Sequence, residues 1–255
     1  MATVLVTGGA KRLGAAIARA CAAAGHRVVI HYGRSGEDAA RLADDIGAAG
    51  TVGGDLADLS AIADLWTRAG EVAGGPIGAL VNSASQFAFD RPEAVDVDLA
   101  ARLQAVNCTA PVLLAAALAA QGEGGAVVNL LDQKLANPNP DFFSYTLSKA
   151  ALAQATVLMA QAFAPAVRVN AVAPGLTLPS GHQSAEAFDR VARANLLERP
   201  VGAEAVADAV VWLLGAQSVT GQTLYVDSGQ RFIKRIGDVI FDEREQGAVN
   251  GEQGR

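Results

Sequence analysis

The sequence predicts a doubly wound α/β domain, with a parallel sheet of about seven strands and helices on both faces. Three observations lead to this fold class. Short apolar, β-branched segments alternate with alanine-rich helical segments along the chain, and a glycine-rich turn joins the first strand directly to the first helix. No linker or internal repeat divides the sequence. We therefore expect one domain over residues 1–232 and a charged tail, residues 233–255, that is partly disordered or packed on a neighbouring subunit.

Composition narrows the possible function classes. The chain has a net charge of −6 and no run of Lys or Arg, which argues against a nucleic-acid-binding surface. Its two cysteines give neither a disulfide framework nor metal-ligand spacing, so we expect no metal. The N-terminus lacks the features of a signal peptide, and no apolar stretch reaches the roughly 20 residues that span a bilayer without glycine or polar interruption. We expect a cytoplasmic protein that binds a small molecule and no membrane.

The first strand and helix frame a candidate dinucleotide site. Residues 3–7 form a short apolar strand, the pattern T-G-x-x-x-R-x-G follows, and residues 15–25 favour a helix. Glycines let the backbone approach a pyrophosphate, and a helix N-terminus offers free N–H groups. Arg12 stands where a middle glycine is common, and a glycine turn without a ligand is the alternative. The residues expected at the cofactor here are Gly8, Lys11, Arg12, Leu13 and Gly14.

The second strand ends in residues that favour NADP over NAD. Residues 26–32 form an apolar strand, and Gly-Arg-Ser follows at 33–35. A carboxylate at this place binds the ribose 2′-hydroxyl of NAD, whereas an arginine accommodates the 2′-phosphate of NADP. No carboxylate occurs between this strand and Glu37. We therefore expect Tyr32, Arg34 and Ser35 to bind NADPH, the alternative being that Arg34 is a solvated loop residue.

The next segments continue the alternation. Residues 37–49 favour a helix, and residues 51–56 form a third strand that ends at Asp55 and Leu56. The Asp55 carboxylate either meets the adenine amino group of the cofactor or caps the following helix, residues 58–73. We expect both Asp55 and Leu56 at the cofactor.

A fourth strand, residues 77–82, leads into a loop at 83–93. In doubly wound sheets, ligands bind outside the carboxyl ends of the strands, and this loop lies there. Ser85 offers a hydrogen-bonding hydroxyl and Phe87 a flat apolar face. The alternative for Phe87 is a place in the core.

A long helix is predicted at residues 97–120, with Asn107 inside it. A buried asparagine within a helix is unfavourable unless its amide is satisfied, so we expect a water or backbone partner. Segments 110–120 and 150–163 are apolar nearly all round. Helices of this kind are buried on both sides, which predicts that they pack against another subunit.

A tyrosine and a lysine four residues apart form the candidate catalytic pair. Tyr145 and Lys149 lie one turn apart on the same face of a predicted helix. The ammonium favours the phenolate, which makes proton donation near neutral pH easier to tune. Asp132 follows a buried strand predicted at 126–131, so the strand end and the helix start converge on one spot. A solvated helix face is the alternative for the Tyr-x-x-x-Lys spacing taken alone.

The remaining sequence completes the sheet. A polar loop with a short helix, residues 176–199, is the predicted mobile lid that sets specificity. The apolar segment 236–241 is expected to dock on a neighbouring subunit. The pattern also predicts strands at 167–172 and 222–229, a helix at 204–215 and a turn at Pro174-Gly175.

These motifs together resemble the short-chain dehydrogenase/reductase family. The resemblance covers residues 3–230 and rests on TGGAKRLG, the Asn82–Ala84 segment, Asn107, YTLSK and Pro174-Gly175, in this order and spacing. It implies that Tyr145 donates a proton, that Lys149 holds the nicotinamide ribose and lowers the pKa of Tyr145, and that Asn107 anchors a water in a proton relay. It also implies a homotetramer. Further cofactor contacts that it implies are Asn82, Ala84, Ser85, Tyr145, Lys149, Pro174 and Gly175.

One departure from the family pattern points to a subgroup. Most of the family carries a serine 13 residues before the tyrosine, where this chain has Asp132. Together with Arg12, HYGRS, Ser85 and Phe87, Asp132 resembles the pteridine reductase subgroup, which includes bacterial dihydromonapterin and dihydrofolate reductases. The resemblance implies that the aromatic ring and the nicotinamide sandwich a pterin, and that Asp132 and Tyr145 protonate a ring nitrogen. The implied substrate contacts are Arg12, Ser85, Phe87, Asp132 and Tyr145.

The expected function is therefore NADPH-dependent reduction of a pterin or dihydrofolate-like substrate. Reduction of a C=N bond forms no ketone oxyanion for a serine to hold, which is consistent with Asp132. The first alternative is a carbonyl or 3-oxoacyl thioester reductase of the same family, in which Asp132 simply replaces the serine. The second is a non-catalytic NADP-binding protein on the same fold, against which the presence of both Tyr145 and Lys149 argues.

Overall fold

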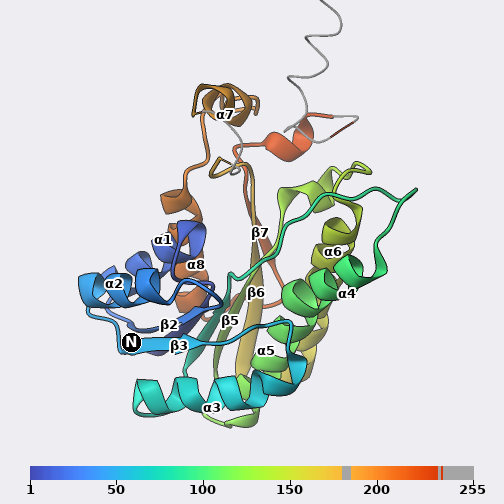
Figure 1. The fold of residues 1–255 in the computed structure, drawn as a ribbon. Coiled ribbons are helices and arrows are strands. Elements are labelled where there is room, and N and C mark those ends of the chain that lie inside the picture. The colour runs from blue at the N-terminus through green and yellow to red at the C-terminus, as the bar shows by residue number, and fades with distance from the viewer. Residues whose placement is uncertain (180–184, 235–236, 238–255) are drawn as a thin grey trace, which may run out of the picture.

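A seven-stranded parallel sheet forms the centre of the molecule (Figure 1). The computed structural model describes residues 1–179, 185–234 and 237. The strand order is β3-β2-β1-β4-β5-β6-β7, and every neighbouring pair is parallel, which confirms the predicted fold class. The strands are β1 (Thr3–Thr7), β2 (Arg27–Tyr32), β3 (Gly50–Gly53), β4 (Ala79–Asn82), β5 (Gly125–Leu130), β6 (Val167–Pro174) and β7 (Thr223–Val226).

Helices cover both faces of the sheet. They are α1 (Arg12–Ala23), α2 (Gly36–Ile46), α3 (Ile62–Ala73), α4 (Val97–Gln104), α5 (Ala110–Ala120), α6 (Phe143–Phe163), α7 (Ala185–Ala192) and α8 (Ala203–Gly215). Short helical turns occur at η1 (Leu59–Ala61), η2 (Ala105–Thr109), η3 (Gln133–Ala136) and η4 (Gln230–Phe232). Figure 1 shows α1, α2 and α8 on one side of the sheet and α4, α5 and α6 on the other.

The alternation of side chains along β1 explains why both faces need a helical layer. Val4 and Val6 belong to the core beneath α1 and α8, whereas Leu5 belongs to the core beneath α3 and α5. All three side chains are completely buried. Successive residues of a strand point to opposite faces, so a continuous apolar strand is stable only when both faces are covered.

The strand order changes direction at β1, and this places the candidate site. β1 pairs with β2 on one side and with β4 on the other, where Thr7 lies opposite Asn82. The connections that leave β1 and β4 therefore diverge and open a crevice outside the carboxyl ends of the strands. The loops after β5 and β6 begin at the same edge of the sheet.

Two predicted boundaries near Asp55 need correction. The third strand ends at Gly53, before Asp55 and Leu56, because the Asp55 carboxylate accepts a hydrogen bond from the N–H of Ala57 (3.0 Å) and closes a turn. The predicted helix 58–73 begins with the turn η1, and its cap is Asp58, which accepts from the N–H of Ser60. Asp55 therefore caps no helix.

The predicted helix 97–120 is continuous but not uniform. Between α4 and α5 the turn η2 is a π-helix, and Asn107 lies inside it. By length and composition alone the run Val97–Ala120 could cross a membrane, and it is the only such run in the described part of the chain. Half of the most apolar 18 residues of this run are buried inside the fold, and the run also contains the charged residues Asp98 and Arg102. We therefore assign the run to the core.

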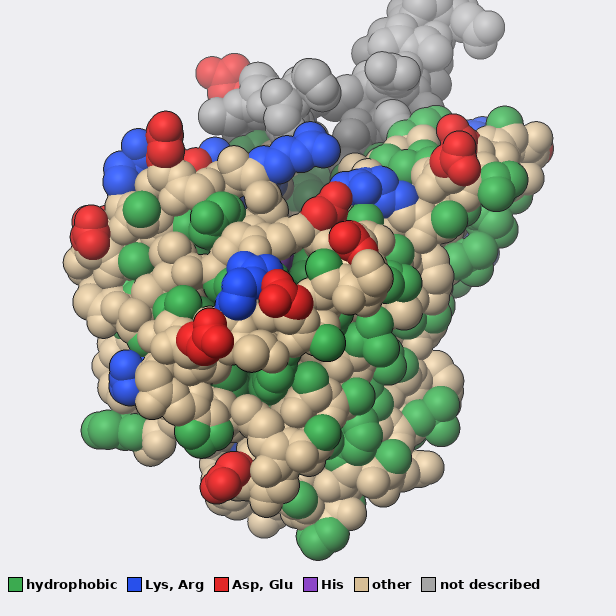
Figure 2. Space-filling model, turned by 60° about the horizontal axis from the view of Figure 1, so that its bottom comes forward, with side chains coloured by type: hydrophobic (Ala, Val, Ile, Leu, Met, Phe, Trp, Pro, Cys, Tyr) green, Lys and Arg blue, Asp and Glu red, His purple; other side chains and the backbone are tan. Residues whose placement is uncertain are grey.

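Apolar side chains remain exposed on the outer helices. On α5 and α6, Leu113, Leu147 and Leu158 are more than one-third exposed, so these helices are not buried on both sides within one chain. Figure 2 shows a face on which hydrophobic side chains are widely spread and basic side chains are interspersed with acidic ones. The predicted docking segment, 236–241, lies outside the described residues except for residue 237. Residues 180–184 of the predicted lid also lie outside them.

Candidate active site

The turn between β1 and α1 is built around two glycines. Gly8 has a φ of +61°, and a Cβ atom there would lie 2.8 Å from the Cα of Ala84, just beyond β4. At Gly14 a Cβ atom would lie 2.1 Å from the carbonyl oxygen of Gly8. A side chain at Gly8 would push the turn away from Ala84, and one at Gly14 would push α1 away from the turn, so both positions require glycine.

Two basic residues of this turn point to different partners. Arg12 has a φ of +53°, the left-handed conformation that a glycine adopts more easily, and its Nη2 donates to the carbonyl oxygen of Pro179 at 2.8 Å. Lys11 instead forms an ion pair with Asp38 of α2 at 2.6 Å. Arg12 therefore links the glycine turn to the loop after β6, while Lys11 is turned toward α2.

The residues at this end of β1 and β2 fit a phosphorylated dinucleotide. No side chain caps the start of α1, so the N–H groups of its first turn, which have no acceptor within the helix, are available to an anion. Arg34 is exposed and has no hydrogen bond or ion pair among the described residues, and Ser35 precedes α2 without making a capping bond. The ring of Tyr32, a residue close to Arg34 and Ser35 in the chain, packs against Gly36 and Gly53.

Other predicted cofactor residues have structural partners. The carboxylate of Asp55 also pairs with Arg102 at 3.1 Å, and Leu56 is buried. Asn82 is buried as well, and its Nδ2 donates to Asn129 Oδ1 at 2.9 Å and to the carbonyl oxygen of Pro111. The Asn82 side chain therefore joins β4 to β5 and α5 inside the fold. The contact of Asp55 with the adenine of the cofactor stays a prediction.

Thr7, which sequence reasoning missed, fixes the loop after β4. Its Oγ1 accepts hydrogen bonds from the N–H groups of Ser83 (3.0 Å) and Ala84 (3.1 Å). The hydroxyl donates to the carbonyl oxygen of Val81. Thr7 thus ties the carboxyl end of β1 to the first residues after β4, and nothing in its local sequence pattern indicates this role.

Asn107 connects the loop after β4 to α6. Its Nδ2 donates to the carbonyl oxygen of Gln86 (2.9 Å) and to Ser148 Oγ (3.0 Å). Its Oδ1 accepts from the N–H of Gln86 (2.8 Å) and from Ser85 Oγ (3.3 Å). The expected backbone partner is therefore Gln86. Two donated and two accepted bonds use the full capacity of an amide, so a water at this place would have to bind the backbone of Asn107.

Asp132, Tyr145 and Lys149 converge beyond the end of β5. The Oη of Tyr145 donates to Asp132 Oδ2 at 2.9 Å, and the backbone N–H of Lys134 donates to Asp132 Oδ1 at 2.8 Å. Lys149 Nζ donates to the carbonyl oxygen of Leu130 at 2.7 Å and lies 5.9 Å from the centroid of the Tyr145 ring. The sequence prediction that these three residues come together agrees with this geometry.

The electrostatics of Lys149 follow from its burial. The side chain is 2% exposed, and burial lowers the pKa of Lys149 to about 8, against the opposing effect of the Asp132 carboxylate. At neutral pH the group is therefore still mainly an ammonium. Two opposite charges therefore lie near the Tyr145 hydroxyl: the Lys149 ammonium favours a phenolate, and the Asp132 carboxylate opposes it.

Phe87 lies against the same tyrosine. Its ring contacts the Tyr145 ring edge-on, with centroids 4.7 Å apart, and stacks on Phe142 at 4.1 Å. Phe87 is nevertheless 48% exposed, so it is not a core residue. A half-exposed aromatic ring therefore contacts the ring of Tyr145, whose hydroxyl bonds Asp132.

Asp90 and Ser144 hold the loop of Phe87 on the helix of Tyr145. Asp90 Oδ1 accepts from the N–H of Ser144 at 2.9 Å, and its Oδ2 accepts from the Ser144 hydroxyl. Both residues are at least nine-tenths buried. The residue before α6, Phe142, makes no capping bond of its own, so Asp90 supplies the cap from a distant loop. No sequence pattern indicated this pair, because 54 positions separate its members.

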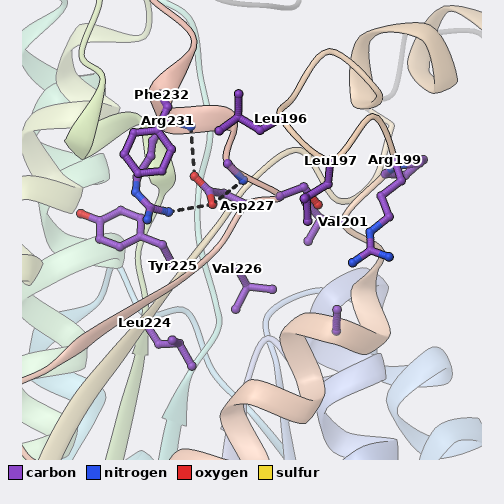
Figure 3. Close-up of a pocket in the computed structure, with 14 residues that line it drawn as sticks. Leu196, Leu197, Arg199, Val201, Leu224, Tyr225, Val226, Asp227, Arg231 and Phe232 are labelled. Carbon is purple, nitrogen blue, oxygen red and sulfur yellow. Dashed lines mark hydrogen bonds and ion pairs between the residues drawn. The ribbon is translucent and has the colours of Figure 1, made fainter.

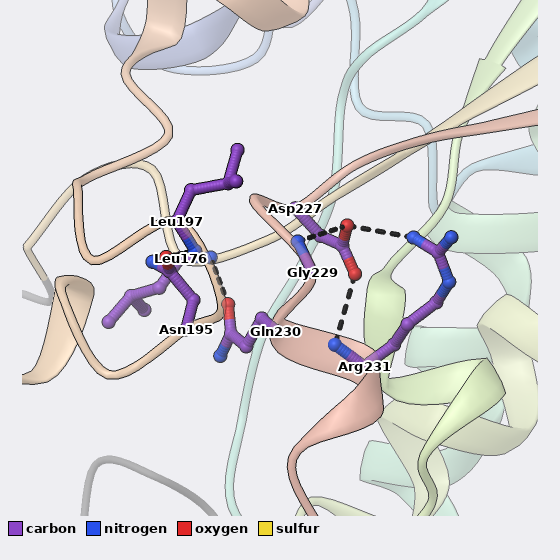
Figure 4. Close-up of polar contacts among 7 residues, drawn as sticks. All are labelled: Leu176, Asn195, Leu197, Asp227, Gly229, Gln230 and Arg231. Atoms are coloured by element: carbon purple, nitrogen blue, oxygen red, sulfur yellow. Dashed lines mark hydrogen bonds and ion pairs between the residues drawn. The ribbon is translucent and has the colours of Figure 1, made fainter.

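The start of the predicted lid is fixed by the segment after β7. The N–H of Leu176 donates to Gln230 Oε1 at 2.8 Å, as Figure 4 shows. A Cβ atom at Gly175 would lie 2.8 Å from the Cα of Asp227. Pro174 ends β6, and Gly175 is therefore required for the close approach of these two segments. A cofactor contact of Pro174 and Gly175 stays a prediction.

A separate cavity of about 690 Å³ lies next to β7 (Figure 3). Arg231 lies between two rings there, with its Cζ 4.4 Å from the ring centroids of both Tyr225 and Phe232. The Arg231 guanidinium also pairs with the buried Asp227 at 2.8 Å. None of the predicted site residues lines this cavity, so the candidate active site is the separate cluster of Asp132, Tyr145 and Lys149.

Comparisons with known proteins show which family and which solved structures this chain is similar to. Residues 8–231 match the protein family described as enoyl-(acyl carrier protein) reductase. The chain is 32% identical to pteridine reductase 1 of Leishmania tarentolae, over 88% of this chain and 94% of that protein. It is also 32% identical to granaticin polyketide synthase putative ketoacyl reductase 2 of Streptomyces violaceoruber, over 90% and 96% of the two chains. Among solved structures, FolM alternative dihydrofolate reductase 1 from Brucella canis, complexed with NADP, superposes with a TM-score of 0.87 at 40% identity, covering 93% of this chain and 96% of that one.

Proposed function

The chain belongs to the short-chain dehydrogenase/reductase family, and we propose that it is an NADPH-dependent reductase of a pterin or dihydrofolate-like substrate. The observation that carries the proposal is the hydrogen bond between Tyr145 and Asp132, next to the exposed ring of Phe87. An acid pair beside an aromatic face suits a flat heterocycle that must be protonated on a ring nitrogen. The likeness to pteridine reductase 1 and to an alternative dihydrofolate reductase supports the same substrate class.

NADPH supplies the hydride when it is bound. The first-turn N–H groups of α1, from Arg12 to Gly14, would hold its pyrophosphate at the positive end of the helix dipole. Arg34 and Ser35 would hold the 2′-phosphate, because the Arg34 guanidinium makes no hydrogen bond or ion pair with the described residues and its shape suits a pair of phosphate oxygens. Lys149 would hold the nicotinamide ribose close to Tyr145.

The proton comes from Tyr145 in this proposal. The Tyr145 hydroxyl gives its proton to the ring nitrogen of the substrate C=N bond, and the remaining phenolate is stabilised by the Lys149 ammonium. Without substrate this hydroxyl donates to Asp132 Oδ2, and Asp132 is itself held by the N–H of Lys134. In this proposal the hydroxyl turns from Asp132 to the substrate nitrogen before it gives up its proton. Acid catalysis of this kind contributes roughly 10²–10⁴-fold to the rate.

The substrate would lie against Phe87. Phe87 is 48% exposed although its ring stacks on Phe142, and Ser85 lies two residues before it in the same loop. Arg12 reaches the loop after β6 and so stands at the other wall of the crevice. We assign to Arg12 and Ser85 the polar edge of the heterocycle, which would fix its orientation.

A carbonyl or 3-oxoacyl thioester reductase is the second candidate. The relationship to a putative ketoacyl reductase favours it, because that relative matches this chain at the same identity as the pteridine reductase does. Asp132 argues against it, since a carboxylate repels the oxyanion that forms from a ketone. A non-catalytic role is least consistent with a buried Lys149 beside Tyr145.

A side-by-side turnover assay tests the proposal. NADPH oxidation would be followed with dihydrobiopterin, dihydromonapterin, dihydrofolate and an acetoacetyl thioester, for the wild-type protein and for Asp132→Ser. We expect turnover of at least one pterin by the wild type and its loss in the variant. Turnover of the thioester alone, or a gain of thioester reduction with no loss of pterin reduction in the variant, would contradict it.

Assembly and location are separate proposals. The exposed leucines of α5 and α6 support a homotetramer, because an apolar patch on an outer helix is stabilised by burial against another subunit. Light scattering coupled to size-exclusion chromatography measures the mass directly, and a monomer would contradict this. The cytoplasmic location and the role of the tail, residues 233–255, stay predictions.

A further inference from the structure

His31, on β2, has three contacts that no part of the sequence pattern indicated. Its side chain is 2% exposed. Nδ1 accepts a hydrogen bond from the N–H of Gly8 at 3.1 Å, and Nε2 lies 3.1 Å from the carbonyl oxygen of Gly54. The backbone carbonyl of His31 accepts from the N–H of Gly9 at 2.9 Å. One residue therefore contacts both the turn after β1 and the segment after β3, the two strands that flank β2 (Figure 1).

The partners determine which nitrogen carries the proton. A backbone N–H can only donate, so the nitrogen that faces Gly8, Nδ1, must be the acceptor. A carbonyl oxygen can only accept, so the nitrogen that faces Gly54, Nε2, must carry the hydrogen. A doubly protonated ring would set two N–H groups against each other at Gly8.

The surroundings keep the ring in this neutral form. Burial lowers the pKa of His31 to about 4, which the bond to Gly54 opposes only in part. The charged groups that face the ring are Arg68 of α3 and Asp55, with opposite effects on that pKa. Arg68 also donates to the carbonyl oxygen of Gly53 at 3.0 Å, so the segment after β3 is held from two sides.

The bonds to His31 decide which backbone groups of the glycine turn remain for a ligand. The N–H groups of Gly8 and Gly9 are both taken up by His31, one by its ring and one by its carbonyl. The N–H groups from Ala10 to Gly14 have no acceptor among the described residues, so they remain available to an anion. A turn that is already held in this shape binds with less loss of conformational entropy.

We infer that His31 is a positioning residue for the dinucleotide cofactor, which holds the glycine turn and the Gly53–Asp55 segment in their binding arrangement through its Nδ1 acceptor and Nε2–H donor. The inference rests on the proposed function only for the identity of the cofactor. His31 does not touch the reacting atoms. Its loss should therefore change the affinity for the cofactor and leave the chemical step nearly unchanged.

Three variants test the inference by direct NADPH titration, without any substrate. In His31→Leu the turn is no longer held, and we expect the NADPH Kd to rise about tenfold, because only a fraction of the free protein is then competent to bind. In His31→Asn the side-chain oxygen can replace the Nδ1 acceptor, so we expect the Kd to stay within about threefold of the wild type. Val29→Ala removes buried atoms from the same face of β2, without contact to the glycine turn, and should lower the Tm without changing the Kd.

The outcomes separate this inference from its alternatives. A His31→Leu protein with an unchanged Kd and a lowered Tm would make His31 an ordinary core residue and overturn the inference. An Asn variant that binds as weakly as the Leu variant would refute the role of the Nδ1 acceptor. Weak NADPH binding by the wild type would contradict the proposed cofactor instead.

A measurement on the wild-type protein covers the case in which His31→Leu does not fold. Nitrogen-15 NMR of the imidazole distinguishes the two neutral tautomers and the doubly protonated ring. We expect the Nε2–H tautomer at neutral pH, in the protein without cofactor. The Nδ1–H tautomer or a charged ring would remove the acceptor for Gly8 and overturn the inference.

Discussion

Replacement of Asp90 by alanine should weaken both the fold and the reaction. The variant removes the acceptor of the Ser144 N–H, which costs about 0.5–2 kcal/mol for a helix cap. It also leaves the buried Ser144 hydroxyl without that acceptor, at a cost of about 1–3 kcal/mol. We expect a combined loss of about 2–4 kcal/mol in the free energy of unfolding, or roughly 5–15 °C in Tm for a chain of this size.

The effect on turnover follows from the position of Tyr145, directly after Ser144 on α6. A displaced helix start moves the proton donor relative to Asp132, and a shift of about 1 Å can lower a rate by up to about a hundredfold. We expect kcat to fall about tenfold with little change in the Kd for NADPH. Asp90→Asn keeps an acceptor for the Ser144 N–H and should recover much of both losses.

A cap elsewhere in the chain serves as the matched control. Asp96 caps α4 by accepting from the N–H groups of Asp98 (2.9 Å) and Leu99 (3.1 Å), and it is exposed. Asp96→Ala should cost about 1 kcal/mol of stability and leave kcat unchanged. Thermal unfolding and steady-state kinetics on the three variants measure both quantities. An Asp90→Ala protein that matches Asp96→Ala in both would refute the assigned link between the loop and the catalytic helix.

Three further predictions concern the proposed catalytic and cofactor residues. Tyr145→Phe should lower kcat roughly 10²–10⁴-fold with an almost unchanged NADPH Kd, and near-normal turnover would exclude Tyr145 as the proton donor. Arg34→Ala should raise the Kd for NADPH about tenfold or more while that for NADH changes little, and equal losses for both would speak against a 2′-phosphate contact. Because the pKa of Lys149 is about 8, its ammonium is present below that pH and lost above it, so kcat/KM should fall as the pH rises through about 8. A pH–rate profile that stays flat across the alkaline range would mean that the charge of Lys149 is dispensable.

The sequence was sufficient for features that depend on local order. The alternation of apolar strands with helices predicts the parallel sheet, because a helix between two strands is the crossover connection that parallel strands need, and such helices together cover both faces of the sheet. The spacing of Tyr145 and Lys149 predicts their proximity, since residues four apart share a helix face. Asp132 could be placed beside them because the carboxyl end of a strand and the start of the next helix meet at the same edge of the sheet.

Features that depend on contacts between distant segments could not be predicted in this way. Asp90 and Ser144 look like ordinary polar residues until the loop after β4 folds onto α6. His31 lies in an apolar strand, where its spacing is that of a core residue. The four hydrogen bonds of the Asn107 amide go to Ser85 and Gln86 in the loop after β4 and to Ser148 in α6. The sequence therefore indicated that this amide needs partners, but not which ones.

The π-helical turn η2 makes the fold sensitive to the insertion or deletion of a residue between α4 and α5. An α-helix turns by about 100° per residue, and a π turn holds one extra residue. Compared with an uninterrupted helix, α5 is therefore rotated by about 100° relative to α4. Deletion of a single residue between Ala105 and Thr109 would restore regular winding and rotate α4 away from α6, carrying Leu103 out of the core. Insertions and deletions should therefore be tolerated in the loops around the site but not in this helix. The number of residues between α4 and α5 sets which side chains face α6, which carries Tyr145 and Lys149.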